Sequence, residues 1–210
     1  PDFDIKFIRA IRKALPNIEL MADSNHAFDL PEAIRVGRVL DECNFGWFEE
    51  PLSPEHPHLF RQLHAKIDTP LSTGECEQTR WGFKTLIEQG HVSLLQPDLA
   101  YCGGPSEALK IRAMASAHGI NCIPHVWGTQ LNLAAGTHFL ASAYHEPGRA
   151  EPKKLLLEYD RTENPLRDEL YEVVVEVKNG EATVPTAPGL GVKIDRNALK
   201  QFDINETETK

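Results

Sequence analysis

Short apolar segments alternate with helical segments along the first 160 residues, and this alternation constrains the fold more than any other feature. FGWF at 45–48, for example, follows one stretch with helix signals and precedes another. Strands that alternate with helices are typical of parallel βα units, whose strands are buried on both faces. We therefore expect an α/β fold with a parallel sheet.

Helix signals separate the expected strands. Residues 2–15 carry apolar side chains four apart, and Asp29 with Glu32 forms a capping-box pattern in which Pro31 occupies the first turn. A helix that starts at Pro105 is expected to end just before Gly119. Six strands are expected, within residues 18–25, 45–51, 69–75, 91–99, 120–126 and 154–160.

The pattern changes after the sixth expected strand. Residues 171–184 read as a small hairpin that turns at Asn179 and Gly180, followed by the loop PTAPGLG and a short helix. We therefore expect a partial six-stranded barrel over 1–160, and a tail over 161–210 that packs on the barrel or on a capping region.

Charge and hydropathy argue against two classes of partner. The formal charge is −9, and Lys and Arg are not clustered, so we expect no nucleic-acid partner. No apolar run approaches the roughly 20 residues of a membrane span, and no leader opens the chain, which predicts a cytoplasmic protein. The cysteines lack CxxC spacing and are expected to be reduced and mostly buried; they are Cys43, Cys76, Cys102 and Cys122.

One ionisable side chain closes each expected strand. These residues are Asp23, Glu49, Glu75, Asp98, His125 and Glu158. In a parallel barrel the carboxyl ends of the strands meet at a common mouth, where such enzymes keep their active sites. The alternative is that these side chains are solvated loop residues. Their regular recurrence favours a shared site.

The first three of these residues are carboxylates on successive strands. Asp23, Glu49 and Glu75 would repel one another unless a cation offset their charge. All-oxygen ligands favour Mg²⁺, with Mn²⁺ as the alternative, and disfavour Zn²⁺. Glu50 follows Glu49 directly, and neighbouring strand residues point to opposite faces, so only one of the two can face this site.

A possible base lies farther along the chain. His125 follows Asp98 by one βα unit, so the carboxylate could orient the imidazole and raise its basicity. The other histidines, such as His56, His58 and His64, are assigned to the surface or to packing.

Six motifs together resemble one family. They are ADSN, WFEEP, STGE, QPDLAYCGG, PHVWGT and LLEYDRTENPLRDEL. The series resembles the C-terminal barrel domain of the enolase superfamily, within the mandelate racemase and muconate lactonizing enzyme family and its mandelate racemase subgroup. The resemblance covers nearly the whole chain and implies a TIM-type (β/α) barrel.

The resemblance assigns roles to the strand ends. It implies that Glu49 faces the metal with Asp23 and Glu75, while Glu50 points away toward the outer packing. It also places Asn25 near the metal site. Three further positions match catalytic residues of the family: the His/Asp dyad falls on His125 and Asp98, and the acid that hydrogen-bonds a substrate carboxylate oxygen falls on Glu158.

The implied reaction is abstraction of the proton α to a carboxylate. The motifs around HVWGT most resemble sugar-acid dehydratases and galactarolactone-type cycloisomerases, in which a β oxygen leaves; a racemase or epimerase is the alternative. The expected substrate is a small carboxylate, a sugar acid or its lactone. Trp127 suits a hydroxylated ligand of this kind. A homo-oligomer is expected for the full-length form.

The sequence departs from the family at its start. The Lys-x-Lys strand, the first barrel strand and the capping domain have no counterpart here, so we expect a barrel that is incomplete at its N-terminus. An inactive, metal-competent fragment is therefore the alternative to an enzyme. The strand edges at 19–25 and 154–160 are expected to be covered by an upstream segment or a partner chain.

Overall fold

The computed structural model describes residues 1–143 and 155–202. Within them the chain divides into two compact units, Pro1–Ile123 and Pro124–Lys210. None of the described helices is long and apolar enough to cross a membrane. Each unit is built around its own elements.

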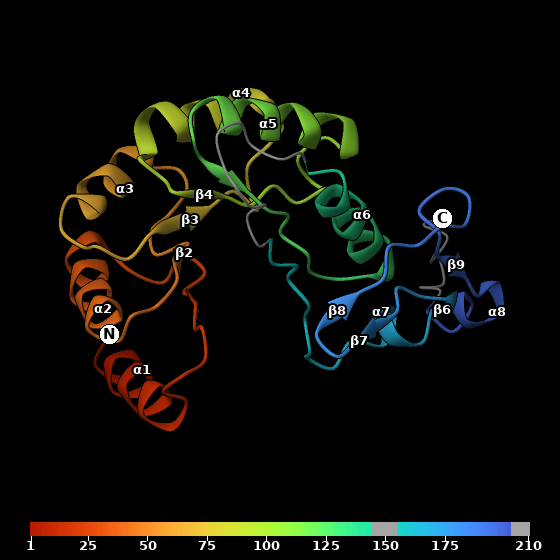
Figure 1. The fold of residues 1–210 in the computed structure, drawn as a ribbon, viewed down its shortest axis with the longest axis horizontal. Coiled ribbons are helices and arrows are strands. Elements are labelled where there is room, and N and C mark those ends of the chain that lie inside the picture. Colours follow the sequence, from red (N-terminus) through yellow and green to blue (C-terminus); the bar gives the residue numbers. More distant parts are fainter. Residues whose placement is uncertain (144–154, 203–210) are drawn as a thin grey trace, which may run out of the picture. The chain divides into compact units, whose positions relative to one another are not determined.

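The first unit is a parallel sheet whose strands alternate with helices (Figure 1). All neighbouring strands pair in parallel, in the order β1-β2-β3-β4-β5. The strands are β1 (Ala22–Asp23), β2 (Phe48–Glu49), β3 (Leu71–Thr73), β4 (Leu94–Leu95) and β5 (Asn121–Cys122). The helices are α1 (Asp2–Ala14), α2 (Leu30–Glu42), α3 (Pro57–His64), α4 (Thr79–Thr85) with its π-helical extension η1 (Leu86–Gly90), and α5 (Pro105–Ala117). The predicted parallel βα units are confirmed.

Local signals place the helix ends as the sequence predicts. The Asp29 carboxylate accepts from the Glu32 N–H at 2.9 Å, and the Glu32 carboxylate accepts from the Asp29 N–H at 3.2 Å. This reciprocal pair satisfies two backbone donors that a helix start leaves open. At the other end of a helix, Gly119 has φ +71 just past α5, a conformation that glycine adopts without steric cost.

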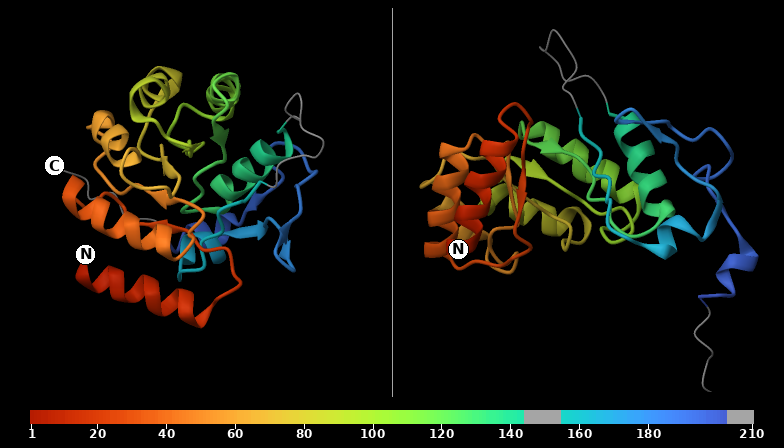
Figure 2. Two further views of the ribbon diagram at one scale, coloured as in Figure 1. Left: turned by 60° about the vertical axis from the view of Figure 1, so that its left-hand side comes forward. Right: turned by 90° about the horizontal axis from the view of Figure 1, so that it is seen from below.

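The helices of the first unit cover the sheet from one side (Figure 1, Figure 2). Strands β2, β3 and β4 are buried over their whole length. Large apolar side chains fill the space between helices and strands; they include Phe48, Phe60, Phe83, Leu71 and Leu95. Strand β1 ends the sheet and is only partly buried.

The second unit joins a helix to small antiparallel pairs. Its elements are α6 (Gln130–Ala141), α7 (Pro165–Asp168), β6 (Tyr171–Val173), β7 (Val177–Lys178), β8 (Glu181–Ala182), β9 (Lys193–Ile194) and α8 (Arg196–Leu199). β6 pairs with β9 and β7 with β8. Asn179 and Gly180 have φ +54 and +79, so the predicted hairpin turn is confirmed with both central residues left-handed.

The prediction of a sixth strand is wrong for the described residues. Residues 155–160 have no regular secondary structure, and the parallel sheet contains five strands. Leu157 and Tyr159 instead pack against a cluster that includes Leu133 of α6 and Val175. These apolar side chains are thus partly buried by contact with α6 and the tail. The compact units divide at 123/124, and the expected domain boundary at 160/161 stays a prediction.

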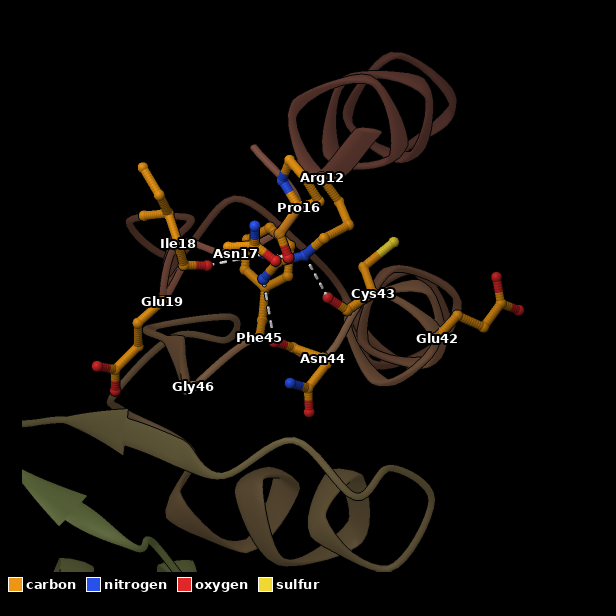
Figure 3. A pocket seen from close by; sticks show the side chains of 10 residues that line it. All are labelled: Arg12, Pro16, Asn17, Ile18, Glu19, Glu42, Cys43, Asn44, Phe45 and Gly46. Atoms are coloured by element: carbon orange, nitrogen blue, oxygen red, sulfur yellow. Dashed lines mark hydrogen bonds between the residues drawn. The ribbon is translucent and has the colours of Figure 1, made fainter. Parts of the chain in front are cut away.

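Arg12 ties two helix–strand connections together in a pocket before the strands (Figure 3). Its guanidinium donates to the carbonyls of Leu15 and Ile18 after α1, at 3.0 and 2.8 Å. It also donates to the carbonyls of Cys43 and Asn44 after α2, at 2.7 and 3.1 Å. Because the guanidinium already donates to these carbonyls, its donors are not available to a bound anion. The pocket is therefore structural.

Replacement of this arginine tests its structural role. Arg12→Met should lower the free energy of unfolding by roughly 2–3 kcal/mol, since several hydrogen bonds to a charged donor are lost and their acceptors remain. Urea unfolding followed by circular dichroism measures the change. The matched control is Arg9→Met on the same helix, which removes one exposed ion pair with Glu42 and should change stability little. Equal effects of the two substitutions would contradict this role.

Candidate functional site

Three carboxylates lie at the carboxyl ends of neighbouring strands in the first unit. Asp23 ends β1 and Glu49 ends β2, and the two residues are direct partners in the strand register. Glu75 follows β3 by two residues. Parallel pairing thus brings the three predicted metal ligands to one edge of the sheet.

Glu49 is the buried member of this set. Its carboxylate accepts from the indole N–H of Trp47 at 3.0 Å. Burial raises the pKa of Glu49, hydrogen bonds from Gln96 and Trp47 oppose the shift, and the charges of Asp23 and Glu75 raise the pKa further. A divalent cation would relieve this repulsion, and an all-oxygen donor set suits a hard ion such as Mg²⁺. The residues present therefore fit the metal that the sequence predicts.

Glu50 lies in a different environment from Glu49. It is 1% exposed, and its backbone is left-handed with φ +40. The hydroxyl of Thr73 donates to Glu50 Oε1 at 3.1 Å, and His26 Nε2 contacts Oε2. Burial raises the pKa of Glu50 from its ordinary value of 4.5 to about 7, and the charge of Glu75 adds to the shift.

Asn25 lies beside the carboxylate set. Its backbone N–H donates to the Asp23 carboxylate at 2.9 Å, and Asn25 is itself left-handed with φ +44. The amide side chain is exposed just past the end of β1. Asp23 and Asn25 are therefore neighbours in a tight turn, and the role of the Asn25 side chain stays a prediction.

Asp98 and His125 belong to different compact units. Asp98 is buried just past β4, and its carboxylate accepts from the Ala100 N–H at 2.7 Å. His125 is half-buried in the second unit, shortly after β5. The pairing of these two side chains stays a prediction.

Glu158 lies beside the segment that contains His125. The backbone N–H of Val126 donates to Glu158 Oε2 at 2.6 Å. This bond brings the expected substrate-binding acid within two residues of Trp127, whose side chain is 62% exposed. Three sequence-predicted residues of the second unit, His125, Trp127 and Glu158, are thus grouped around one backbone amide.

Sequence reasoning missed the neighbours of Glu50. His26 was assigned with the surface or packing histidines, and the cysteines were expected to be mostly buried. His26 is half-buried against Glu50, and Cys76 is exposed while Cys43, Cys102 and Cys122 are buried. Burial, followed by the charges of Glu50, Glu75 and Glu77, raises the pKa of the Cys76 thiol. The only signal in the sequence is that His26 and Cys76 each follow a strand end closely.

Comparison with known proteins places these features in a family context. Residues 1–198 match the family model described as enolase C-terminal domain-like. The chain is 40% identical over 200 residues to the D-galactarolactone cycloisomerase of Agrobacterium fabrum. This match covers 95% of this chain and 53% of that protein. It is 30% identical over 200 residues to the arabinonate dehydratase of Saccharolobus solfataricus, covering 95% of this chain and 51% of that protein.

A solved structure of another cycloisomerase has a fold similar to that of this chain. The 3,6-anhydro-D-galactonate cycloisomerase from Zobellia galactanivorans matches with a TM-score of 0.87 at 39% identity. The match covers 96% of this chain and 55% of that protein. The chain therefore spans about half the length of the relatives that it matches.

The buried Glu50 predicts a pH dependence of stability. Because its pKa in the folded protein is raised to about 7, the folded state binds this proton more tightly than the unfolded chain does. The resulting stability is complete below pH 4.5 and is lost as the pH rises through about 7. Glu50→Gln should therefore flatten the fall in unfolding free energy between those values, measured by urea unfolding with a chelator present.

An exposed carboxylate supplies the control. Glu163→Gln, in an exposed loop of the second unit, should keep the pH dependence of the unsubstituted protein. If Glu50→Gln also kept that dependence, the assignment of the raised pKa to Glu50 would be wrong.

Proposed function

Because the chain belongs to the enolase C-terminal domain-like family, we propose that it forms the metal-binding part of an enzyme that removes the proton α to the carboxylate of a sugar acid. The observation that carries the proposal is the set of three carboxylates at the ends of β1, β2 and β3. A bound cation would offset the repulsion between such neighbouring carboxylates.

Asp23, Glu49 and Glu75 would hold Mg²⁺, with Mn²⁺ as the alternative. The cation, when bound, supplies positive charge that stabilises the negative charge developing on the substrate carboxylate. The chain's own contribution is to hold the oxygen donors in place: Trp47 orients the Glu49 carboxylate, and the turn at Asn25 orients Asp23.

The remaining roles are proposed from the family motifs. His125 would take the α proton, with Asp98 orienting its imidazole. Glu158 would bind a carboxylate oxygen of the substrate, and the bond from the Val126 N–H supports this role because it fixes the carboxyl group. Asn25 and Trp127 would contact the hydroxylated part of the substrate.

Two outcomes of proton removal are supported by the relatives. A dehydratase and a cycloisomerase are both among them, and both outcomes are proposed as β-eliminations. In each, the α proton passes to His125 and the C–H electrons form a new double bond. The C–O bond at the β carbon then breaks, and its electrons leave with the oxygen, as hydroxide from a sugar acid or as the ring carboxylate from a lactone. The substrate class is therefore an aldonate, an aldarate or an aldarolactone.

Metal titration tests the carboxylate assignment and requires only residues of the first unit. Glu49→Gln should weaken Mg²⁺ binding more than roughly tenfold, because a ligand is lost, as measured by isothermal titration calorimetry. Glu50→Gln is the matched neighbour and should leave Mg²⁺ affinity nearly unchanged. Equal weakening by both substitutions would overturn the assignment that Glu49 faces the metal and Glu50 points away from it.

Exchange of the substrate proton tests the base. With a full-length protein that contains this chain and a panel of sugar acids and lactones in deuterium oxide, NMR should detect deuterium incorporation at the α carbon. His125→Asn should abolish the exchange that the histidine catalyses, and Asp98→Asn should slow it by lowering the imidazole's basicity. Mandelate and muconate serve as controls and should be poor substrates. Exchange at the unsubstituted rate in both variants would exclude this pair.

A further inference from the structure

A second group of metal-ligating atoms lies beside the carboxylate set. His26, Glu50 and Cys76 each offer one donor atom, and the three atoms lie within 4.8 Å of one another. They come from three places in the first unit: the connection after β1, the end of β2 and the connection after β3. None of them belongs to the proposed Mg²⁺ ligands.

Two of the donors meet in a place closed to water. Glu50 Oε2 and His26 Nε2 contact each other and are shielded from solvent. Within the described residues this ion pair is the polar contact of both atoms, and neither has a further hydrogen bond, while Oε1 of the same carboxylate accepts from Thr73. Two ligand-type atoms buried against each other have lost their hydration, and a coordinated cation would offset that loss for both.

The backbone holds these donors in place. His26 and Glu50 are both left-handed, with φ +63 and +40. The His26 N–H donates to the Glu50 carbonyl at 2.7 Å, and the Ser24 N–H donates to the Glu49 carbonyl at 3.1 Å. The two strained residues are thus tied to each other, which keeps the imidazole against the carboxylate.

The donor types indicate the class of ion. Imidazole nitrogen, carboxylate oxygen and thiolate sulfur form a mixed set that suits Zn²⁺ and similar ions, whereas Mg²⁺ prefers oxygen alone. Three protein ligands leave a fourth tetrahedral position for water. Bond lengths of about 2.0–2.3 Å around zinc place its ligand atoms roughly 3.3–3.6 Å apart. The contacting atoms of His26 and Glu50 are closer than this spacing and would move apart around the ion, and the exposed Cys76 side chain can turn toward it.

We propose that His26, Glu50 and Cys76 form a second cation site that takes a thiophilic divalent ion such as Zn²⁺. The adjacent pair Glu49 and Glu50 then serves two different metals, the first residue a hard ion and the second a softer one. This site is independent of the proposed catalytic function, because none of its ligands has a role in proton removal.

Cobalt provides a direct probe of the site. Added to the reduced protein with excess Mg²⁺ present to occupy the carboxylate set, Co²⁺ should produce a thiolate-to-metal charge-transfer band and visible bands of tetrahedral coordination, and these bands should saturate at one ion per chain. Zn²⁺ should displace it, and a large excess of Mg²⁺ should not. Bound Zn²⁺ should also protect Cys76 from alkylation, read by mass spectrometry.

Substitutions separate this site from simpler ones. Cys76→Ser should abolish the charge-transfer band, while His26→Gln and Glu50→Gln should each weaken Co²⁺ binding more than roughly tenfold. The double variant His56→Gln and His58→Gln is the control for surface histidine binding and should keep the band. Circular dichroism checks folding, and His26→Gln decides the outcome if Glu50→Gln does not fold.

Two results would overturn the proposal. The first is that Co²⁺ does not bind to the unsubstituted protein, or that it binds without the thiolate band. The second is an unchanged affinity in His26→Gln, because it would mean that the exposed thiol binds the ion without the buried pair.

Discussion

Repulsion between carboxylates at the ends of neighbouring parallel strands is the constraint on which the candidate site depends. Strand register makes Asp23 and Glu49 direct partners, and Glu75 follows the next strand. Backbone hydrogen bonds of the paired strands fix the backbone positions of Asp23 and Glu49. Burial of Glu49 strengthens the effect, since a carboxylate removed from water needs a compensating charge. The proposed cation would offset this repulsion, and the oxygen donors suit a hard ion.

The adjacent residues Glu49 and Glu50 show how one residue step changes the chemistry. Glu49 continues the strand and accepts from Trp47, whereas Glu50 leaves the strand with a left-handed backbone and accepts from Thr73. The left-handed turn places the second carboxylate against His26. Two identical side chains thus reach different partners, and this difference supports separate roles for them.

Much of the fold follows from local sequence signals. The capping box at Asp29 and the turn at Asn179 and Gly180 form as predicted, because each depends on residues close together in the chain. The sixth strand was predicted from apolar residues alone, and it failed because burial does not require strand pairing. Leu157 is partly buried by contact with the cluster of α6 and the tail instead.

The sequence by itself determined the order of helices and strands, the family, and the acidic residues that close the strands. These features rest on periodicity and on motifs that neighbouring residues define. Only the tertiary structure decided which side chains meet. The grouping of His26, Glu50 and Cys76 joins three separate connections, and two left-handed residues aim its donors. Those conformations arise from the pairing of β1, β2 and β3, a long-range interaction that no local pattern encodes.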